Sequence, residues 1–271
     1  MYIYSLVKDI LQTYETMDLY SNISQPQWNC LFPHPFTMLL SGASNSEKTV
    51  CFLTFLEKHK YLIYPPPKKL VVAYKHFQPM YNEFNKHIET KFIQGVPTEE
   101  QVQGADLLFI DDLMSEIDKC IEFFTVFSHH MKISVVFITQ NLYQKGLRTL
   151  SLNANYLVIF NNPRDSSQMK VLANQLEPSD SKLVTEAYET ATNKAHGYLV
   201  INCRQKTDKL FKYRDNIDVF DNCSIFVSKK WLEKYKKTKV LTAPYIDTLV
   251  RLINSGLSLV EAINTAHKML L

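Results

Sequence analysis

Short runs of apolar residues that end in polar ones recur along this chain. Leu107–Ile110 is followed by two aspartates, and Ile133–Thr139 is followed by a glutamine and an asparagine. Apolar runs without polar alternation are typical of strands that are buried on both faces of a parallel sheet. We expect such strands at Phe36–Leu40, Leu70–Tyr74, Lys91–Ile93, Leu107–Ile110, Ile133–Thr139, Tyr156–Phe160 and His196–Asn202.

Segments with apolar residues at helical spacing separate these runs. Lys48–Tyr61 is one, and three prolines at 65–67 stop it. Because helices alternate with buried strands, the pattern predicts an α/β fold with a mainly parallel sheet flanked by helices. The other expected helices are Met1–Gln27, Ser115–His130, Asp165–Gln175, Ser179–Thr192 and a C-terminal one opened by a capping pair, Ser258 and Glu261.

The composition suits one sizeable globular domain, since 46% of the 271 residues are hydrophobic and 21% are charged. The longest apolar runs are far shorter than the roughly 20 residues of a membrane-spanning helix, so no membrane segment is expected. The N-terminus lacks the features of a secretory signal. The five cysteines are scattered, which indicates reduced thiols in an intracellular protein without structural zinc.

The strand expected at Phe36–Leu40 leads into a sequence typical of a phosphate-binding loop (P-loop). The pattern G-x-x-x-x-G-K-[ST] is met at Gly42, Lys48 and Thr49, but Glu47 stands where its second glycine is expected. In such a loop the backbone N–H groups face phosphates, the lysine meets the β- and γ-phosphates, and the threonine holds Mg²⁺. We therefore expect ATP and Mg²⁺ as cofactors, with a chance surface loop as the alternative. The expected binding residues are Gly42, Ala43, Ser44, Asn45, Ser46, Glu47, Lys48 and Thr49.

The apolar run Leu107–Ile110 and its two aspartates fit a Walker B strand. Asp111 would orient Mg²⁺ through water, and Asp112 would polarise the attacking water, a role more often held by glutamate. The alternative is a strand end with a polar turn. Lys48 lies 63 residues before Asp111, which leaves room for a helix, a strand and a connector. The two motifs together make a chance match much less plausible than either does alone.

Three further polar residues are candidates for catalysis. Gln140 follows the strand Ile133–Thr139. Because ligands of open α/β sheets bind at the carboxyl ends of strands, Gln140 could contact the γ-phosphate. A plain strand-end turn is the alternative. Arg148 and Arg164 could each act as an arginine finger on a neighbouring subunit's ATP, or serve only at the surface. The expected catalytic set is Lys48, Asp112, Gln140 and Arg148.

Charge is clustered rather than abundant. The net charge is only +3, yet six lysines fall between Lys229 and Lys239. Clustered positive charge is what a nucleic-acid contact requires, and a solvated helix face is the alternative. The chain also has only six glycines, where average usage predicts roughly 19, so the glycine missing from the P-loop belongs to a wider scarcity.

These motifs carry a family likeness. The chain resembles the FtsK/HerA-type packaging ATPases of Polinton (Maverick) and adintovirus-like elements, which are related to the poxvirus-type packaging ATPase. The likeness spans roughly residues 30–217 and has a short match near the C-terminus. The matching stretches are His34–Met38, Ser41–Thr49, Leu108–Met114, Phe127–His130, Ser134–Tyr143, Arg148–Tyr156, Asn162–Asp165, Gly197–Leu199 and Asn254–Leu259.

The resemblance implies a RecA-like P-loop NTPase core in a homo-oligomeric ring that drives double-stranded viral DNA into a capsid. It implies a capsid portal or vertex protein as a partner. The expected location is the host nucleus, a cytoplasmic viral factory or the virion. The chain then divides into an N-terminal extension at 1–29, an ATPase core at 30–217 and a basic, helical C-terminal segment at 218–271.

The chain departs from the family pattern inside the P-loop. The family reads S-G-P-[ST]-G-[SC]-G-K-[ST], whereas Ala43, Asn45 and Glu47 here replace the proline and two glycines. Asparagine tolerates left-handed backbone conformations. A carboxylate about 4 Å from a phosphate costs ~1 kcal/mol when hydrated and about 4 kcal/mol at a partly buried site. We therefore expect Glu47 to weaken ATP binding unless its side chain turns outward.

Two other functions fit parts of the sequence. A non-hydrolysing scaffold or interaction protein from a decayed or domesticated viral element would explain the lost glycines. A DNA-binding module that relies on the lysine cluster alone would leave the first 217 residues without a role.

Overall fold

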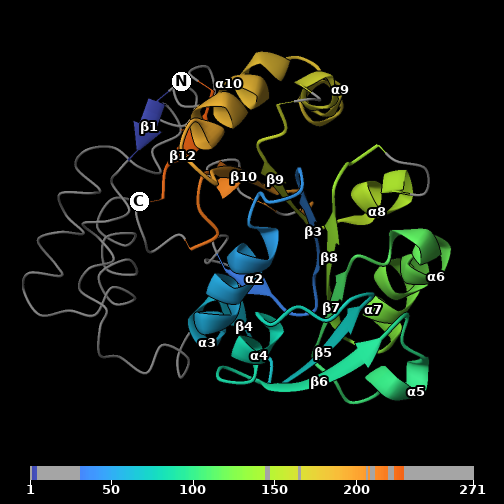
Figure 1. The fold of residues 1–271 in the computed structure, drawn as a ribbon. Coiled ribbons are helices and arrows are strands. Elements are labelled where there is room, and N and C mark those ends of the chain that lie inside the picture. The colour runs from blue at the N-terminus through green and yellow to red at the C-terminus, as the bar shows by residue number, and fades with distance from the viewer. Residues whose placement is uncertain are drawn as a thin grey trace, which may run out of the picture.

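The computed structural model describes residues 2–4, 31–143, 147–163, 166–205, 207, 211–218 and 223–228. Its centre is a ten-stranded sheet in the order β1-β12-β11-β10-β9-β3-β8-β7-β5-β6 (Figure 1). The strands are β1 (Tyr2–Tyr4), β3 (Thr37–Ser41), β5 (Lys69–Tyr74), β6 (Glu89–Gln94), β7 (Leu107–Asp111), β8 (Ser134–Thr139), β9 (Tyr156–Phe160), β10 (Tyr198–Asn202), β11 (Tyr213–Arg214) and β12 (Ile225–Val227). A separate two-stranded pair joins β2 (Phe32–Pro33) to β4 (Ile63–Tyr64).

Helices cover both faces of this sheet. They are α2 (Lys48–Glu57), α3 (His59–Leu62), α4 (Tyr81–Phe84), α5 (Glu99–Val102), α6 (Ile117–Glu122), α7 (Ser128–His130), α8 (Leu147–Asn153), α9 (Ser166–Leu176) and α10 (Ser181–Thr192). A 3₁₀ turn, η1 (Met114–Glu116), precedes α6, and a π-helical turn, η2 (Phe123–Phe127), joins α6 to α7. In Figure 1, α2, α3 and α4 stand on one side of the sheet, and α6, α7 and α8 stand on the other.

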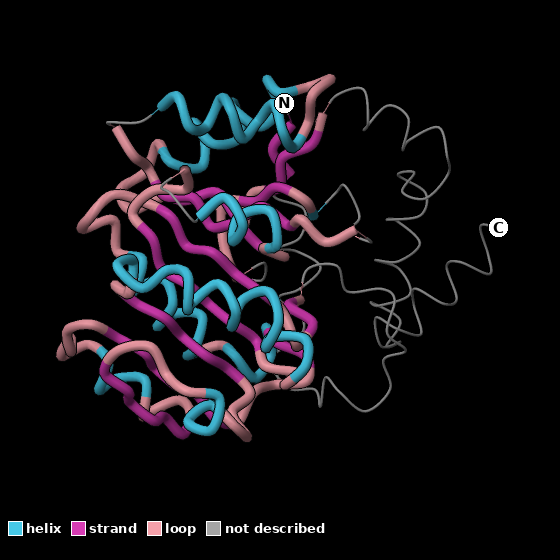
Figure 2. Tube along the Cα trace, turned by 90° about the vertical axis from the view of Figure 1, so that its right-hand side faces the viewer, coloured by secondary structure: helices cyan, strands magenta, loops and turns pink. Residues whose placement is uncertain are grey.

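The middle of the sheet is parallel, as the continuous apolar runs predict. The six strands β3 and β5 to β9 pair in parallel, and all residues of β3, β7, β8 and β9 are buried. The tube in Figure 2 shows the strands side by side between helices. The phosphate-loop strand β3 lies between β8 and β9, and β8 separates it from β7. This is the RecA-like α/β arrangement, so the predicted fold class is confirmed.

One edge of the sheet is antiparallel, which the sequence pattern did not indicate. Strand β10 pairs antiparallel with β9, with Tyr198 opposite Phe160, and β11, β12 and β1 continue in the same manner. Two helices, α9 and α10, lie between β9 and β10, so the chain re-enters the sheet at the edge where it left. The loop before β10 therefore lies at the carboxyl edge of the parallel strands.

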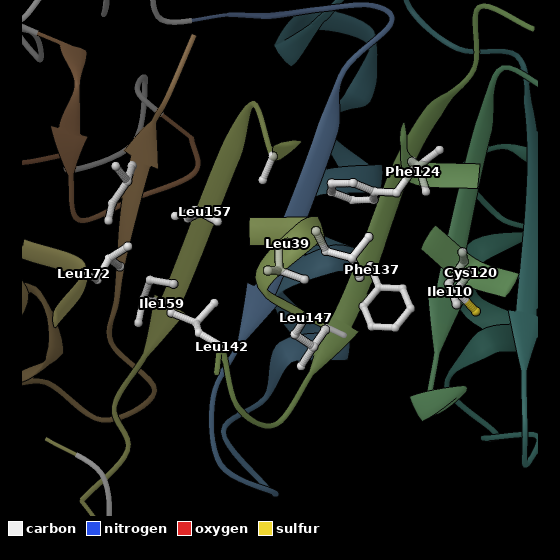
Figure 3. Packing of buried hydrophobic residues seen from close by; sticks show 14 of the residues in the cluster. Leu39, Ile110, Cys120, Phe124, Phe137, Leu142, Leu147, Leu157, Ile159 and Leu172 are labelled. Atoms are coloured by element: carbon white, nitrogen blue, oxygen red, sulfur yellow. The ribbon is translucent and has the colours of Figure 1, made fainter. Parts of the chain in front are cut away.

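Two hydrophobic layers fill the space between sheet and helices. On one face Leu39, Phe137 and Leu157 pack with Leu147 of α8, as Figure 3 shows. On the other face the α2 residue Phe52 stacks on Phe109 of β7, with ring centroids 4.0 Å apart and an interplanar angle of 12°. The helix that follows the P-loop is thus packed directly against the strand that carries the aspartates.

Several predicted boundaries were wrong. The helix expected over Met1–Gln27 begins instead with the strand β1 at residues 2–4, where pairing with β12 overrides local preference; the rest of that range lies outside the described residues. The helix expected over Lys48–Tyr61 divides at Lys58 into α2 and α3. The helix expected over Ser115–His130 begins as the 3₁₀ turn and contains the π turn.

Other predictions fall outside the described residues or remain untested. The C-terminal helix opened by Ser258 lies in the undescribed part of the chain. The division into segments at 29 and 217 remains a prediction, although β12 of the last segment belongs to the central sheet. Among the described residues, none of the helices combines the length and hydropathy that a membrane span requires.

Candidate functional site

The predicted P-loop connects β3 to α2 at the carboxyl edge of the sheet. The backbone N–H of Gly42 donates to the Thr139 carbonyl of the neighbouring strand at 3.2 Å. A Cβ atom at Gly42 would lie 2.5 Å from the Phe160 Cβ and 2.8 Å from the Ser46 hydroxyl oxygen. Residue 42 must therefore be glycine for the loop to pass this close to β9.

The loop closes around the side chain of Lys48. This lysine is buried, and its Nζ donates to the carbonyls of Gly42 at 2.8 Å and Ala43 at 2.7 Å and to the Ser46 hydroxyl at 3.2 Å. Burial lowers the pKa of Lys48, and the nearby Asp111 charge partly opposes that shift. The ammonium group thus lies inside the loop, where an anion bound to the backbone would meet it.

Two loop positions at which the resembling ATPases have glycine keep a glycine-like backbone here. Asn45 and Glu47 both have φ of 63°, in the left-handed region. Asparagine adopts this region readily, but other L-residues pay roughly 1–2 kcal/mol. Glu47 therefore carries backbone strain at the residue immediately before α2.

The side chain of Glu47 turns outward. Its Oε1 lies 3.4 Å from the His196 Nε2, and both side chains are about half exposed, at 45% and 51%. His196 belongs to the loop before β10, and sequence reasoning did not single it out. The antiparallel pairing of β10 with β9 brings the start of β10 beside the end of β9, at the edge where the P-loop lies. The sequence pattern did not indicate that pairing.

Asp111, at the end of β7, is the most constrained acidic group of the site. Its Oδ2 accepts hydrogen bonds from the Tyr81 hydroxyl at 2.7 Å, from the Gln78 amide at 3.2 Å and from the Thr49 hydroxyl at 3.5 Å. Burial raises the pKa of Asp111, and the bond from Tyr81 and the charge of Lys48 counteract that rise. Burial, together with the neighbouring carboxylate, also raises the pKa of Tyr81.

The sequence pattern did not indicate Tyr81 and Gln78 as site residues, because the connector between β5 and β6 in which they lie has no recognisable motif. The one available signal was position: the connector starts from the carboxyl end of β5, the strand next to β7. Thr49 and Asp111 were both predicted to hold Mg²⁺, and the structure places their oxygens together.

Asp112 and Gln140 occupy the same edge as the loop. Asp112 follows β7 directly, is exposed and has φ of 58°. Gln140 follows β8, whose last residue, Thr139, is paired with Ser41 just before the loop. Within the described part of the chain, neither side chain makes a hydrogen bond or ion pair, so both side chains are free to reorient toward a ligand.

The structure does not join Arg148 to the loop. Arg148 is exposed on α8, which packs on the opposite face of the sheet from α2. No hydrogen bond or ion pair between described residues joins Arg148 to the P-loop or to Asp111. Arg164 and the cluster Lys229–Lys239 lie outside the described residues.

A cavity of about 210 Å³ lies beside the P-loop. It is lined by residues 43–46 of the loop, by the end of β9 at Phe160 and Asn161, and by His196 and Gly197. Asp111 lies on the other side of the loop, because β9 and β7 flank β3 and β8 from opposite directions. Within the described ranges, no group of three or more His, Cys, Asp or Glu side chains gathers as a metal site.

Comparison with known proteins shows similarity only at the level of structure. No protein-family model matches the chain, and no curated protein matches it. The chain is similar to the genome packaging NTPase B204 from Sulfolobus turreted icosahedral virus 2 in complex with AMP, with a TM-score of 0.46 and 12% identity over 67% of this chain and 96% of that one. In the complex of B204 with ATP-gammaS the TM-score is 0.42 and the identity 13%, over 67% and 96% of the two chains.

A cellular protein shows a comparable likeness. The KaiC-like protein PH0186 from Pyrococcus horikoshii OT3 matches with a TM-score of 0.40 and 12% identity, over 75% of this chain and 96% of that one. These values are too low to assign an activity, so a function for this chain has to be supported by the residues of its own site.

Proposed function

We propose that this chain binds Mg²⁺-ATP at residues 42–49 and hydrolyses it. The observation that carries the proposal is the meeting of three predicted groups at one edge of the sheet. Lys48 is buried inside its loop, and the Thr49 hydroxyl donates to the Asp111 carboxylate at 3.5 Å, although these two residues are far apart in the sequence. A phosphate cradle beside a hydroxyl and a carboxylate is the chemistry that a metal–nucleotide complex requires.

The residues present fit both cofactors. The P-loop comes too close to β9 for any side chain at Gly42, and the Lys48 ammonium lies within it. Hard oxygen donors from Thr49 and Asp111 suit Mg²⁺, which takes few protein ligands and completes its shell with phosphates and water. When bound, ATP supplies the phosphoryl group and Mg²⁺ neutralises its charge.

The remaining roles follow from position at the carboxyl edge. Asp112 would orient and polarise the attacking water, and Gln140 would contact the γ-phosphate and that water. Arg148 would serve a neighbouring subunit as an arginine finger, since it is exposed on the face away from α2. These roles require both Asp112 and Gln140 to turn toward the loop when nucleotide is present.

We further propose that the chain works as a homo-oligomeric ring that moves double-stranded viral DNA into a capsid. Support comes from the sequence resemblance to FtsK/HerA-type packaging ATPases of Polinton and adintovirus-like elements. A capsid portal or vertex protein would dock the ring, and the protein would act in the host nucleus, in a cytoplasmic viral factory or in the virion.

A non-hydrolysing scaffold is the second candidate, and one observation favours it. Glu47 is strained at φ of 63° and brings a carboxylate to the loop that would bind phosphate, which would weaken nucleotide binding. The outward position of that side chain reduces the penalty, which favours the ATPase over the scaffold.

The deciding experiment measures Mg²⁺-ATP binding and turnover, with and without double-stranded DNA, on this chain and on the Glu47→Gly variant. We expect measurable but weak binding that the variant strengthens about tenfold, because removing a half-exposed carboxylate and the backbone strain is worth roughly 1–2 kcal/mol.

Lys48→Ala is the matched control, and it should abolish binding. If neither this chain nor Glu47→Gly binds nucleotide, the nucleotide proposal is wrong. If both bind but neither turns ATP over, the scaffold is correct.

A further inference from the structure

The carboxylate of Glu47 is the one charged group of the P-loop that opposes an anionic ligand. It stands directly before α2, whose N-terminal backbone N–H groups favour negative charge. If the Glu47 carboxylate pointed into the loop, it would occupy the place where an anionic ligand would bind. In the structure its Oε1 lies instead 3.4 Å from the Nε2 of His196.

His196 is held in place by a tightly closed loop. The Gly197 N–H donates to the Lys194 carbonyl at 3.0 Å, and a Cβ at Gly197 would lie 2.3 Å from the Ala191 carbonyl oxygen. The backbone of His196 is left-handed, with φ of 56°. Lys194, the nearest cation along this loop, is directed to Asp215 at 3.5 Å and does not compete for Glu47.

The strand order determines on which side of the P-loop the Glu47 carboxylate lies. Strand β10 lies beyond β9 on one side of β3, whereas β7 lies beyond β8 on the other side. His196 precedes β10 and Asp111 ends β7. The Glu47 carboxylate is therefore held on the side of the loop away from Asp111, the predicted metal ligand to which the Thr49 hydroxyl donates.

We propose that His196 is a positioning residue that keeps the Glu47 carboxylate clear of the phosphate site, and so compensates for the glycine that this loop lacks. The inference rests on the proposed nucleotide function. The contact is an ion pair when the imidazole is protonated, and the neutral ring can still donate a hydrogen bond from Nε2. A half-exposed pair of this kind changes the ratio of outward to inward positions of the Glu47 side chain by up to about fivefold.

The test is a double-mutant cycle read by the dissociation constant of a fluorescent ATP analogue in the presence of Mg²⁺. The four proteins are the full chain, His196→Ala, Glu47→Gln and the double variant. We expect His196→Ala to weaken binding about fivefold when Glu47 is present, and by less than about twofold in the Glu47→Gln background. A purely structural role for His196 would weaken binding equally in both backgrounds.

Two further variants keep the test decisive. His196→Asn tolerates the left-handed backbone and replaces the alanine variant if that one does not fold. His196→Lys supplies a cation of similar reach and should restore binding to within about twofold of the unmodified chain. Equal effects of His196→Ala in both backgrounds, or no effect in either, would overturn the inference while leaving nucleotide binding intact. A cycle in which none of the four proteins binds would instead refute the proposed function.

Discussion

Asp111 shows how one residue's environment sets its chemistry. Three donors converge on its Oδ2, and burial raises its pKa. The other carboxylate oxygen accepts no hydrogen bond from the described residues. Tyr81 and Gln78 therefore orient the carboxylate so that one oxygen remains for a ligand.

We predict that Tyr81→Phe destabilises the fold by about 1.5–3 kcal/mol at neutral pH, since a buried hydrogen bond to a charged group is lost while the ring still packs. The substitution also removes the contact that counteracts the raised pKa of Asp111, so that pKa rises further. The loss is present where Asp111 is ionised and shrinks as the pH falls through its pKa. Denaturant unfolding between about pH 4 and about pH 8 measures the loss of unfolding free energy and its dependence on pH.

Two controls accompany this prediction. Tyr74→Phe changes a neighbouring ring that makes no hydrogen bond to Asp111, and it should have little effect. In an Asp111→Asn background the cost of Tyr81→Phe should fall by more than half. An unchanged cost in that background would show that Tyr81 stabilises the core and not the carboxylate.

Among the elements, the decisive contact is between α2 and β7. Phe52 stacks on Phe109 and also packs edge-on against Phe84 of α4. The stack ties the helix that begins with Lys48 to the strand that ends with Asp111. The spacing between the two ends of the site is thereby set by aromatic packing.

We predict that Phe52→Ala destabilises the protein by about 3–5 kcal/mol, the usual cost of truncating a buried phenylalanine. In the fraction that stays folded, nucleotide binding should weaken, because the start of α2 loses its support against β7. Thermal melting and ATP-analogue binding report the two effects. Phe77→Ala is the control, since that ring is 46% exposed, and it should cost less than about 1 kcal/mol.

At the scale of the whole molecule, the two faces of the sheet carry different parts of the proposed catalytic site. Helix α2, which follows the P-loop, packs on one face of the sheet, and α8, which carries Arg148, packs on the other. An arginine in that place can serve catalysis only if a neighbouring subunit presents it.

We predict that Arg148→Ala and Lys48→Ala proteins are each nearly inactive in ATP turnover but regain activity when mixed. In a mixed ring, an intact P-loop of the first variant meets an intact arginine of the second. Steady-state ATPase rates across mixing ratios measure this. Turnover that never exceeds the sum of the separate variants would rule out an arginine finger at this position.

The proposed binding of DNA also concerns the molecule as a whole. Each lysine of the cluster 229–239 that contacts a phosphate should add about 0.9 to the slope of log K against log salt. We predict that Lys236→Gln with Lys237→Gln lowers that slope by about 2, whatever the DNA sequence. Lys60→Gln with Lys86→Gln, both on described surface outside the cluster, is the charge-matched control. Salt-independent binding would contradict an electrostatic role for the cluster.

The local pattern determined most of the individual elements. The buried strands at 107–111, 134–139 and 156–160 follow from continuous apolar runs, and the helices after the first and the third of them follow from apolar residues at helical spacing. The P-loop and the aspartates were recognisable because their residues are adjacent in the chain. The antiparallel edge, the short helices α4, α5 and α8, and the strand at residues 2–4 depend on partners that are distant in sequence, and they were missed or wrong.

The sequence by itself therefore determined an α/β chain with a P-loop pattern and an acidic strand end, and among the loop's departures from that pattern it marked Glu47 as the one that brings a negative charge. Only the tertiary structure decided where that carboxylate goes. Two helices between β9 and β10 return the chain to the carboxyl edge and bring His196 to Glu47, while β8 sets Asp111 on the opposite side. The reason is physical: a charge's effect depends on its distance through space from the site, and sequence separation does not report that distance.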